Sequence, residues 1–152
     1  MGARSGTSLA ALLLAQRLVD TPEPPLRSSE YWALLDSVGD PAVLLGLDAG
    51  ALARTAGVDP ALADRVARLL DAATSFAFRL DEAEQSGLRV IASVDGDYPH
   101  RLVERLGHAA PPLLYAVGEP VLLQGPLLGV VGSREVSEVV ADVARAAAAA
   151  AA

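Results

Sequence analysis

The chain contains no cysteine, and this absence removes several kinds of chemistry at once. Without thiols there is no disulfide bond, no thiolate nucleophile and no zinc site built on cysteine ligands. A protein without disulfides suits the reducing cytosol. We therefore expect a cytoplasmic protein whose fold rests on hydrophobic packing.

Lysine is also missing, and all 12 basic residues are arginine. The 19 acidic residues give a formal net charge of −7. Because non-specific affinity for nucleic acid comes mainly from neutralising phosphates, this balance excludes a protein that binds nucleic acid over its whole surface. Any nucleic-acid site must be a local patch or lie in residues outside this sequence.

Long hydrophobic runs are absent, although 52% of the residues are apolar. No run approaches the roughly 20 apolar residues that a membrane-spanning helix needs. Gln16 and Arg17 interrupt the apolar run at 9–15, and no cleavage site typical of a secretory signal follows. We expect residues 8–20 to form a short amphipathic helix of a protein that has no membrane partner.

Proline and glycine divide the next part of the chain into helical pieces. The segment TPEPPLR at 21–27 predicts a linker, because three prolines in four positions cannot continue a helix. A helix is predicted at 29–38, capped by Ser28 or Ser29, with an apolar face that includes Tyr31 and Leu34. Residues 28–87 therefore predict a compact all-α domain related to sterile-alpha-motif and helix-hairpin-helix modules, which we expect to fold independently.

Three acidic residues mark the starts of the helical pieces between 39 and 86. Asp40 and Asp48 precede the first two pieces, and Gly57 ends the second. Asp59 followed by proline opens a third helix, whose apolar spacing continues to Ser86.

The pattern changes at Leu88, where strands are predicted at 88–94, 113–118 and 127–131. The apolar run at 127–131 is typical of a buried parallel sheet. An amphipathic helix follows, with Val136, Val139, Val140 and Val143 at helical spacing. Residues 88–152 therefore predict the beginning of an α/β domain, which makes the whole chain α+β, and residues 1–27 form an N-terminal helix and linker.

The junction between that last strand and helix has the chemistry of a phosphate site. A helix start leaves backbone N–H groups unpaired, and its dipole favours negative charge. Gly132 permits close approach, Ser133 and Ser137 offer hydroxyl groups, and Arg134 can hold a phosphate with two parallel hydrogen bonds. The alternative is an ordinary turn, in which a serine caps the helix and the arginine is solvated.

Four elements within about forty residues together resemble the DNA-processing protein A family (DprA, also called Smf). They are Asp95/Asp97-Tyr98-Pro99 with Leu102, Pro111-Pro112-Leu113-Leu114-Tyr115-Ala116-Val117-Gly118, Val121-Leu122-Leu123, and Gly132-Ser133-Arg134 with Ser137. This resemblance implies a small helical domain followed by an extended Rossmann-like domain. It also implies that the chain is the front part of a longer protein. The chain departs from the family pattern after the loop, where Val139-Val140 stands in the area of the usual Tyr-Gly.

The resemblance also implies a function. Members of this family bind single-stranded DNA, partly through the Gly-Ser-Arg loop, and help to load the RecA recombinase during natural transformation. They are not known as enzymes, and the pattern implies no cofactor. A homodimer would form through α/β residues that follow this sequence.

Two other functions are compatible with the residues. The loop could hold the phosphate of a small nucleotide in a nucleotide-binding or nucleotide-processing protein, or the helical part could be a protein-interaction module.

We expect structural roles for the other polar residues. Asp95 and Asp97 are turn formers, Asp81, Glu82 and Glu84 form a solvated helix face, and His100 and His108 lack the partners of a metal site. At least one of Tyr31 and Trp32 belongs to the core.

Overall fold

The computed structural model describes residues 4–125, 129, 131–133 and 135–151. The chain divides into two compact units, Met1–Pro120 and Val121–Ala152. The boundaries expected at 27/28 and 87/88 both lie inside the first unit. Its elements are α1 (Gly6–Ala15), α2 (Ser28–Val38), the 3₁₀ turn η1 (Pro41–Leu44), α3 (Ala49–Ala56), α4 (Pro60–Leu70), α5 (Ala73–Gln85), β1 (Leu88–Ala92), α6 (Arg101–Leu106), the 3₁₀ turn η2 (Gly107–Ala109) and β2 (Leu113–Val117).

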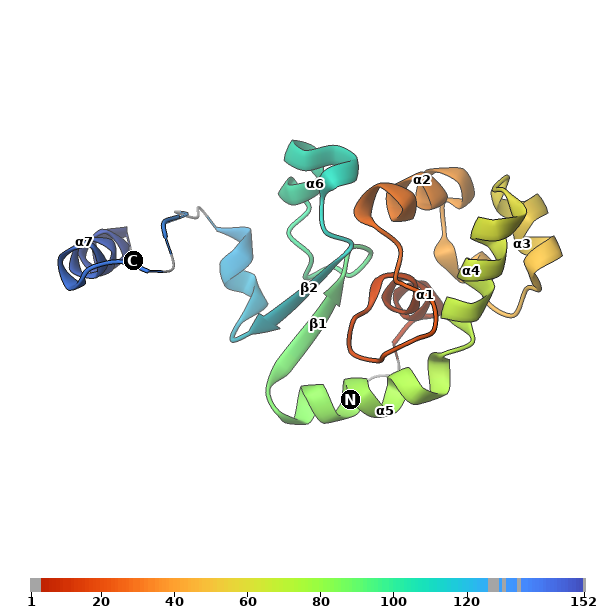
Figure 1. Ribbon diagram of the computed structural model, residues 1–152, viewed down its shortest axis with the longest axis horizontal. Coiled ribbons are helices and arrows are strands. Elements are labelled where there is room, and N and C mark those ends of the chain that lie inside the picture. Colours follow the sequence, from red (N-terminus) through yellow and green to blue (C-terminus); the bar gives the residue numbers. More distant parts are fainter. Residues whose placement is uncertain (1–3, 126–128, 130, 134, 152) are drawn as a thin grey trace. The chain divides into compact units, whose positions relative to one another are not determined.

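Helix α1 forms the centre of the first unit (Figure 1), where it contacts α2, η1, α4 and β1. Residues 10–14 are consecutive and at most 1% exposed. Because five consecutive residues cover the full circumference of a helix, this part of α1 has no solvent face. The expectation of an amphipathic helix over 8–20 is therefore wrong. Its sequence is apolar all round, and the helix ends at Ala15.

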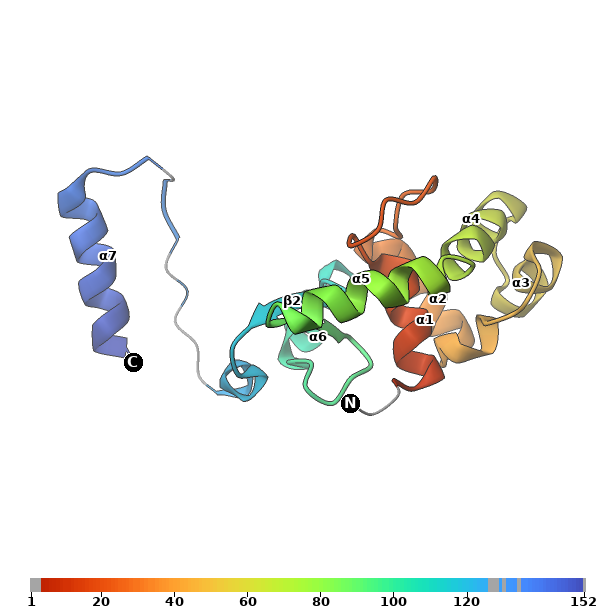
Figure 2. The ribbon, with the colours of Figure 1, turned by 90° about the horizontal axis from the view of Figure 1, so that it is seen from below.

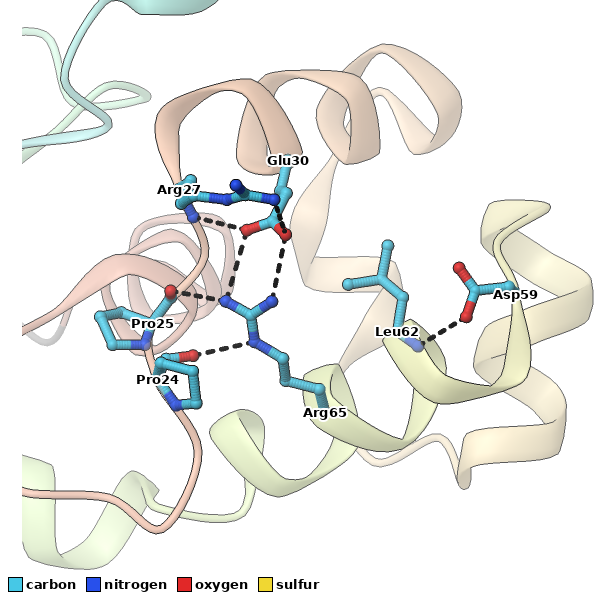
Figure 3. A network of polar contacts seen from close by, with 7 residues as sticks. All are labelled: Pro24, Pro25, Arg27, Glu30, Asp59, Leu62 and Arg65. Atoms are coloured by element: carbon cyan, nitrogen blue, oxygen red, sulfur yellow. Dashed lines mark hydrogen bonds and ion pairs between the residues drawn. The ribbon is translucent and has the colours of Figure 1, made fainter.

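The proline-rich segment after α1 is irregular, as predicted, but it is held firmly against the helices. The Arg65 guanidinium donates to the carbonyl oxygens of Pro24 and Pro25 at 2.9 and 2.7 Å. It also donates to both carboxylate oxygens of Glu30 at 3.1 and 3.3 Å (Figure 3). Nearby, Leu26 is buried, and its amide donates to the carbonyl of Leu14. The segment is thus bound to α1, α2 and α4 along its length.

Helix α2 starts one residue earlier than predicted, and neither serine is its cap. Arg27 occupies the cap position, and its amide donates to the Glu30 carboxylate at 2.8 Å. This is the bond of a capping box in which a carboxylate at the third helical position accepts from the amide of the cap residue. The predicted apolar face is confirmed, since Tyr31 and Leu34 are buried, and Trp32 is buried as well.

The predicted aspartate caps are confirmed. Asp40, Asp48 and Asp59 each accept a hydrogen bond from a backbone amide at the start of η1, α3 and α4. Gly57 ends α3 at φ 64°, in the left-handed region that favours glycine. The third helix does not continue to Ser86 as predicted. It ends at Leu70, and a new helix, α5, begins at Ala73.

The two strands of the first unit pair antiparallel, with Leu88 opposite Val117 and Ala92 opposite Leu113. Val90, Ala92 and Leu113 belong to the hydrophobic core shared with α1 and α2. Helix α5 packs against β1, and it lies below α1 in Figure 1 and in front of α1 in the view from below in Figure 2. The described part of the chain is therefore α+β, as predicted.

In the second unit, the structure contains the end of a 3₁₀ turn (Pro120–Gln124) and helix α7 (Glu138–Ala151). The strand predicted at 127–131 lies mostly outside the described residues, and Gly129 and Val131 are irregular. Helix α7 begins two residues after Val136, which the spacing had placed on its apolar face. In neither unit do the described residues contain a helix long and apolar enough to cross a membrane.

Candidate phosphate-binding loop

The residues predicted to bind phosphate lie on the irregular segment directly before α7. Gly132, Ser133 and Ser137 are all exposed. Arg134 lies outside the described residues. Three of the four predicted residues are therefore accessible and close together in the chain at one helix start.

The two serines differ in their local bonding. The Ser133 hydroxyl accepts a hydrogen bond from the amide of Glu135 at 3.2 Å, which closes a small turn within the loop. Ser137 stands at the start of α7, where its carbonyl accepts from the amide of Ala141 at 3.0 Å. Among the described residues its hydroxyl has no partner, so it is free to donate to a ligand.

Gly132 is open to approach from outside. A β-carbon placed on it would meet no atom of the described residues within 4 Å. Its φ is not in the left-handed region, so the turn itself does not require glycine. The effect of glycine at this position is therefore to let a ligand approach the backbone closely, and not to permit an unusual backbone conformation.

The charges around the loop set limits on an anion site. Glu135 and Glu138 are exposed, and Glu138 lies in the first turn of α7. An acidic residue there is favourable for the helix dipole, but it repels a phosphate. Arg134 is the one basic residue between 131 and 144. Anion binding at this loop thus depends on backbone amides, the free Ser137 hydroxyl and Arg134.

A second helix start that could hold a phosphate is closed. At α4 the Asp59 carboxylate accepts from the amides of Ala61 and Leu62, both at 3.0 Å. Figure 3 shows the bond to Leu62. These are the groups that an anion at this helix start would occupy. The α3–α4 hairpin therefore presents its own carboxylate where a phosphate would have to lie.

The aromatic, acidic and histidine residues discussed in the sequence analysis have structural roles. Tyr31 and Trp32 are both buried, with their rings edge to face at 5.3 Å, so neither can stack on a base. The carboxylate of Asp95 accepts from the amide of Ala92 at 2.8 Å, which confirms it as a turn former. His108 pairs with Asp36 at 2.8 Å, and the ring of His100 packs edgewise on that of Tyr98.

Sequence reasoning missed the role of Arg4. Its guanidinium donates to Glu84 at 2.7 Å, to the carbonyl of Val90 at 3.0 Å and to Asp95 at 3.4 Å. Glu84 is thus an ion-pair partner, whereas we expected it on a solvated helix face. No local pattern signals a contact between residues 80 or more positions apart in the chain.

The comparisons with known proteins bear on the same part of the chain. Residues 89–152 match the model of a family described as DNA recombination-mediator protein A. The match includes β1, α6, β2, the Gly-Ser-Arg loop and α7. No curated protein and no solved structure matches the chain. Over residues 89–152, this match confirms the resemblance to the DNA recombination-mediator protein A family that the sequence motifs indicated.

Proposed function

We propose that this protein binds single-stranded DNA in the cytoplasm and acts in recombination during natural transformation, where it assists the loading of RecA. The observation that carries the proposal is the family match over residues 89–152, which contains the Gly-Ser-Arg loop at the start of α7. The open backbone at Gly132 and the free hydroxyl of Ser137 support a phosphate contact there.

The architecture proposed for the complete protein follows the same family. Residues 28–87 correspond to a small helical domain of the sterile-alpha-motif or helix-hairpin-helix type. Residues 88–152 begin a Rossmann-like domain, whose further strands would complete the sheet and allow two copies to pair. The closed start of α4 supports the loop, rather than the helical hairpin, as the proposed DNA contact.

Arg134→Ala in the full-length protein tests the proposal. We expect affinity for single-stranded DNA to fall by about 1–3 kcal/mol, the value of a charge-assisted hydrogen bond. The loss should be the same for different base sequences, because a phosphate contact carries no sequence information. The log–log dependence of affinity on salt should become shallower by about 0.7, as expected for one phosphate contact fewer on a single strand.

Arg145→Ala is a suitable control, because Arg145 already pairs with Asp142 on α7. It should leave DNA binding and its salt dependence nearly unchanged. If Arg134→Ala keeps its affinity for DNA but loses binding of a mononucleotide, the loop serves a nucleotide site and the proposal is wrong. If Arg134→Ala instead lowers the melting temperature strongly, the arginine has a structural role.

A further inference from the structure

Tyr115 differs from the other two tyrosines of the chain. Tyr31 and Tyr98 are at most 1% exposed, whereas Tyr115 is 41% exposed. It lies on β2 opposite Val90, and the next residue on the same strand face, Val117, is 82% exposed. Along this face of β2, the side chains thus become more exposed from Leu113 to Val117, and the Tyr115 ring is open to solvent.

The exposed ring is nevertheless held in place. The hydroxyl of Tyr115 accepts a hydrogen bond from the backbone amide of Arg17 at 2.9 Å. Arg17 lies on the irregular segment that follows α1, so the bond joins two segments 98 positions apart. A ring fixed at its tip loses little conformational freedom when a ligand packs against its face.

The residue whose amide holds this ring, Arg17, carries a positive charge. The side chain of Arg17 is exposed and makes no hydrogen bond or ion pair with any residue that the structure describes. Arg79, by contrast, is paired with Glu82 at 2.8 Å. The exposed Asp20 and Glu119 lie near Arg17 and Val117 in the sequence. Charge alone therefore gives this surface little affinity for phosphate, and the ring is its main binding group.

We propose that Tyr115 and Arg17 form a second contact for single-stranded DNA, in which one base stacks on the Tyr115 ring and Arg17 contacts the adjacent phosphate. This inference rests on the proposed function, but it concerns residues of the first unit and not the loop before α7. Rigid aromatic rings with a neighbouring arginine are how proteins hold single strands without reading their sequence. The face of any base can stack, so the contact should tolerate all four.

Tyr115→Leu in the full-length protein tests the contact, with oligo-dT compared against an abasic oligonucleotide of the same length. Stacking on one base predicts that the variant binds oligo-dT about 5- to 100-fold more weakly. Affinity for the abasic strand should not change, because it offers phosphates but no base. Tyr115→Phe should keep most of the affinity for oligo-dT, since the ring remains.

Phe78→Leu provides the matched control. Phe78 is 76% exposed on α5, but acidic residues follow it at positions 81 and 82. This variant removes an exposed aromatic ring without a free cation beside it, and it should bind oligo-dT like the wild type. An equal loss in Phe78→Leu and Tyr115→Leu would overturn the proposal.

A measurement on the wild-type protein removes any dependence on how the variants fold. Ultraviolet cross-linking to an oligonucleotide that contains 5-iododeoxyuridine should give an adduct on Tyr115. Adducts found only on other residues would contradict the proposal. An equal loss of affinity for oligo-dT and for the abasic strand in Tyr115→Leu would also contradict it, because the surface would then contact something other than bases. If Arg134→Ala weakens binding and Tyr115→Leu does not, only this inference fails. If the wild-type protein does not bind the strand, the proposed function fails as well.

Discussion

The hydroxyl groups of Tyr31 and Ser93 lie 2.8 Å apart, and both side chains are buried. Tyr31 belongs to α2 and Ser93 directly follows β1, so this bond joins the helical part of the first unit to its sheet. Burial raises the pKa of the Tyr31 hydroxyl. The pair is therefore neutral at physiological pH and acts as a hydrogen bond, not as an ion pair.

Removing both hydroxyls of this pair should cost less free energy of unfolding than the sum of the costs of removing each one alone. Tyr31→Phe or Ser93→Ala leaves a buried hydroxyl without its partner, and each should lower the free energy of unfolding by about 1–3 kcal/mol. The double variant leaves no unsatisfied group, so its loss should be smaller than the sum of the two single losses. Urea unfolding of the four proteins measures this difference. Strict additivity would show that the two hydroxyls do not depend on each other.

Arg65 should matter much more for stability than its neighbour Arg68. Arg65→Met removes four hydrogen bonds to Pro24, Pro25 and Glu30 from a side chain that is 18% exposed. We expect a loss of about 2–3 kcal/mol, as for charged hydrogen bonds. Arg68→Met breaks one ion pair of a side chain that is 52% exposed, and should cost less than about 1 kcal/mol. Similar losses for both variants would contradict this role of Arg65.

Glu30 should make stability depend on pH in the acid range. Hydrogen bonding to Arg27, with smaller contributions from Arg65, lowers the pKa of its carboxyl from 4.5 to about 2. A carboxyl whose pKa is lower in the folded state stabilises the protein above its unfolded pKa, and this contribution is lost as pH falls toward the folded pKa. The advantage of wild type over Glu30→Gln should therefore be constant above about pH 5 and shrink between about pH 4.5 and 2. Unfolding curves across that range test it, and an advantage that grows on acidification would be incompatible.

Variants of Asp59 test whether its carboxylate stabilises α4 and whether the start of α4 has any part in DNA binding. Asp59→Ala removes the acceptor for the amides of Ala61 and Leu62, and should cost about 1 kcal/mol. Asp59→Asn keeps an acceptor oxygen and should cost less. Neither variant should change the affinity for single-stranded DNA, because the proposed DNA contacts lie at the loop before α7 and at Tyr115, not at the start of α4. Stronger DNA binding by Asp59→Ala would show that the hairpin retains a latent phosphate site.

The central position of α1 changes what is expected of shorter chains. Residues 28–90 lack α1, whose side chains fill the centre of the first unit. We now expect this segment to melt without a cooperative transition, whereas residues 4–120 should unfold in one. Circular dichroism during heating distinguishes the two. A sharp transition for residues 28–90 would restore the independent helical domain that the sequence suggested.

Local signals in the sequence were sufficient to place most helices and both described strands. The aspartate caps and Gly57 act within one turn of the chain, so they are visible in a short window. The break between α4 and α5 was missed, because the apolar spacing continues across positions 71 and 72 while the chain turns there. The burial of α1 was also missed, since which elements surround a helix depends on contacts with distant residues.

For the candidate sites as well, features set by local sequence were predicted, and features set by distant contacts were not. Gly132, Ser133 and Ser137 were identified because the residue types themselves indicate phosphate chemistry. The exposure of Tyr115, by contrast, depends on where the segment after α1 lies relative to β2. Contacts between residues nearly one hundred positions apart leave no periodic signal in the sequence.

Trp32 is the only tryptophan of the chain. Its indole N–H donates to the carbonyl of Ala110 at 2.8 Å from a buried position on α2. The protein therefore carries one intrinsic fluorophore, placed where the helices meet the segment that leads into β2. Opening of this junction would expose the indole to water and shift its emission to longer wavelengths. Separation of α2 from the sheet can thus be followed in real time without any added label.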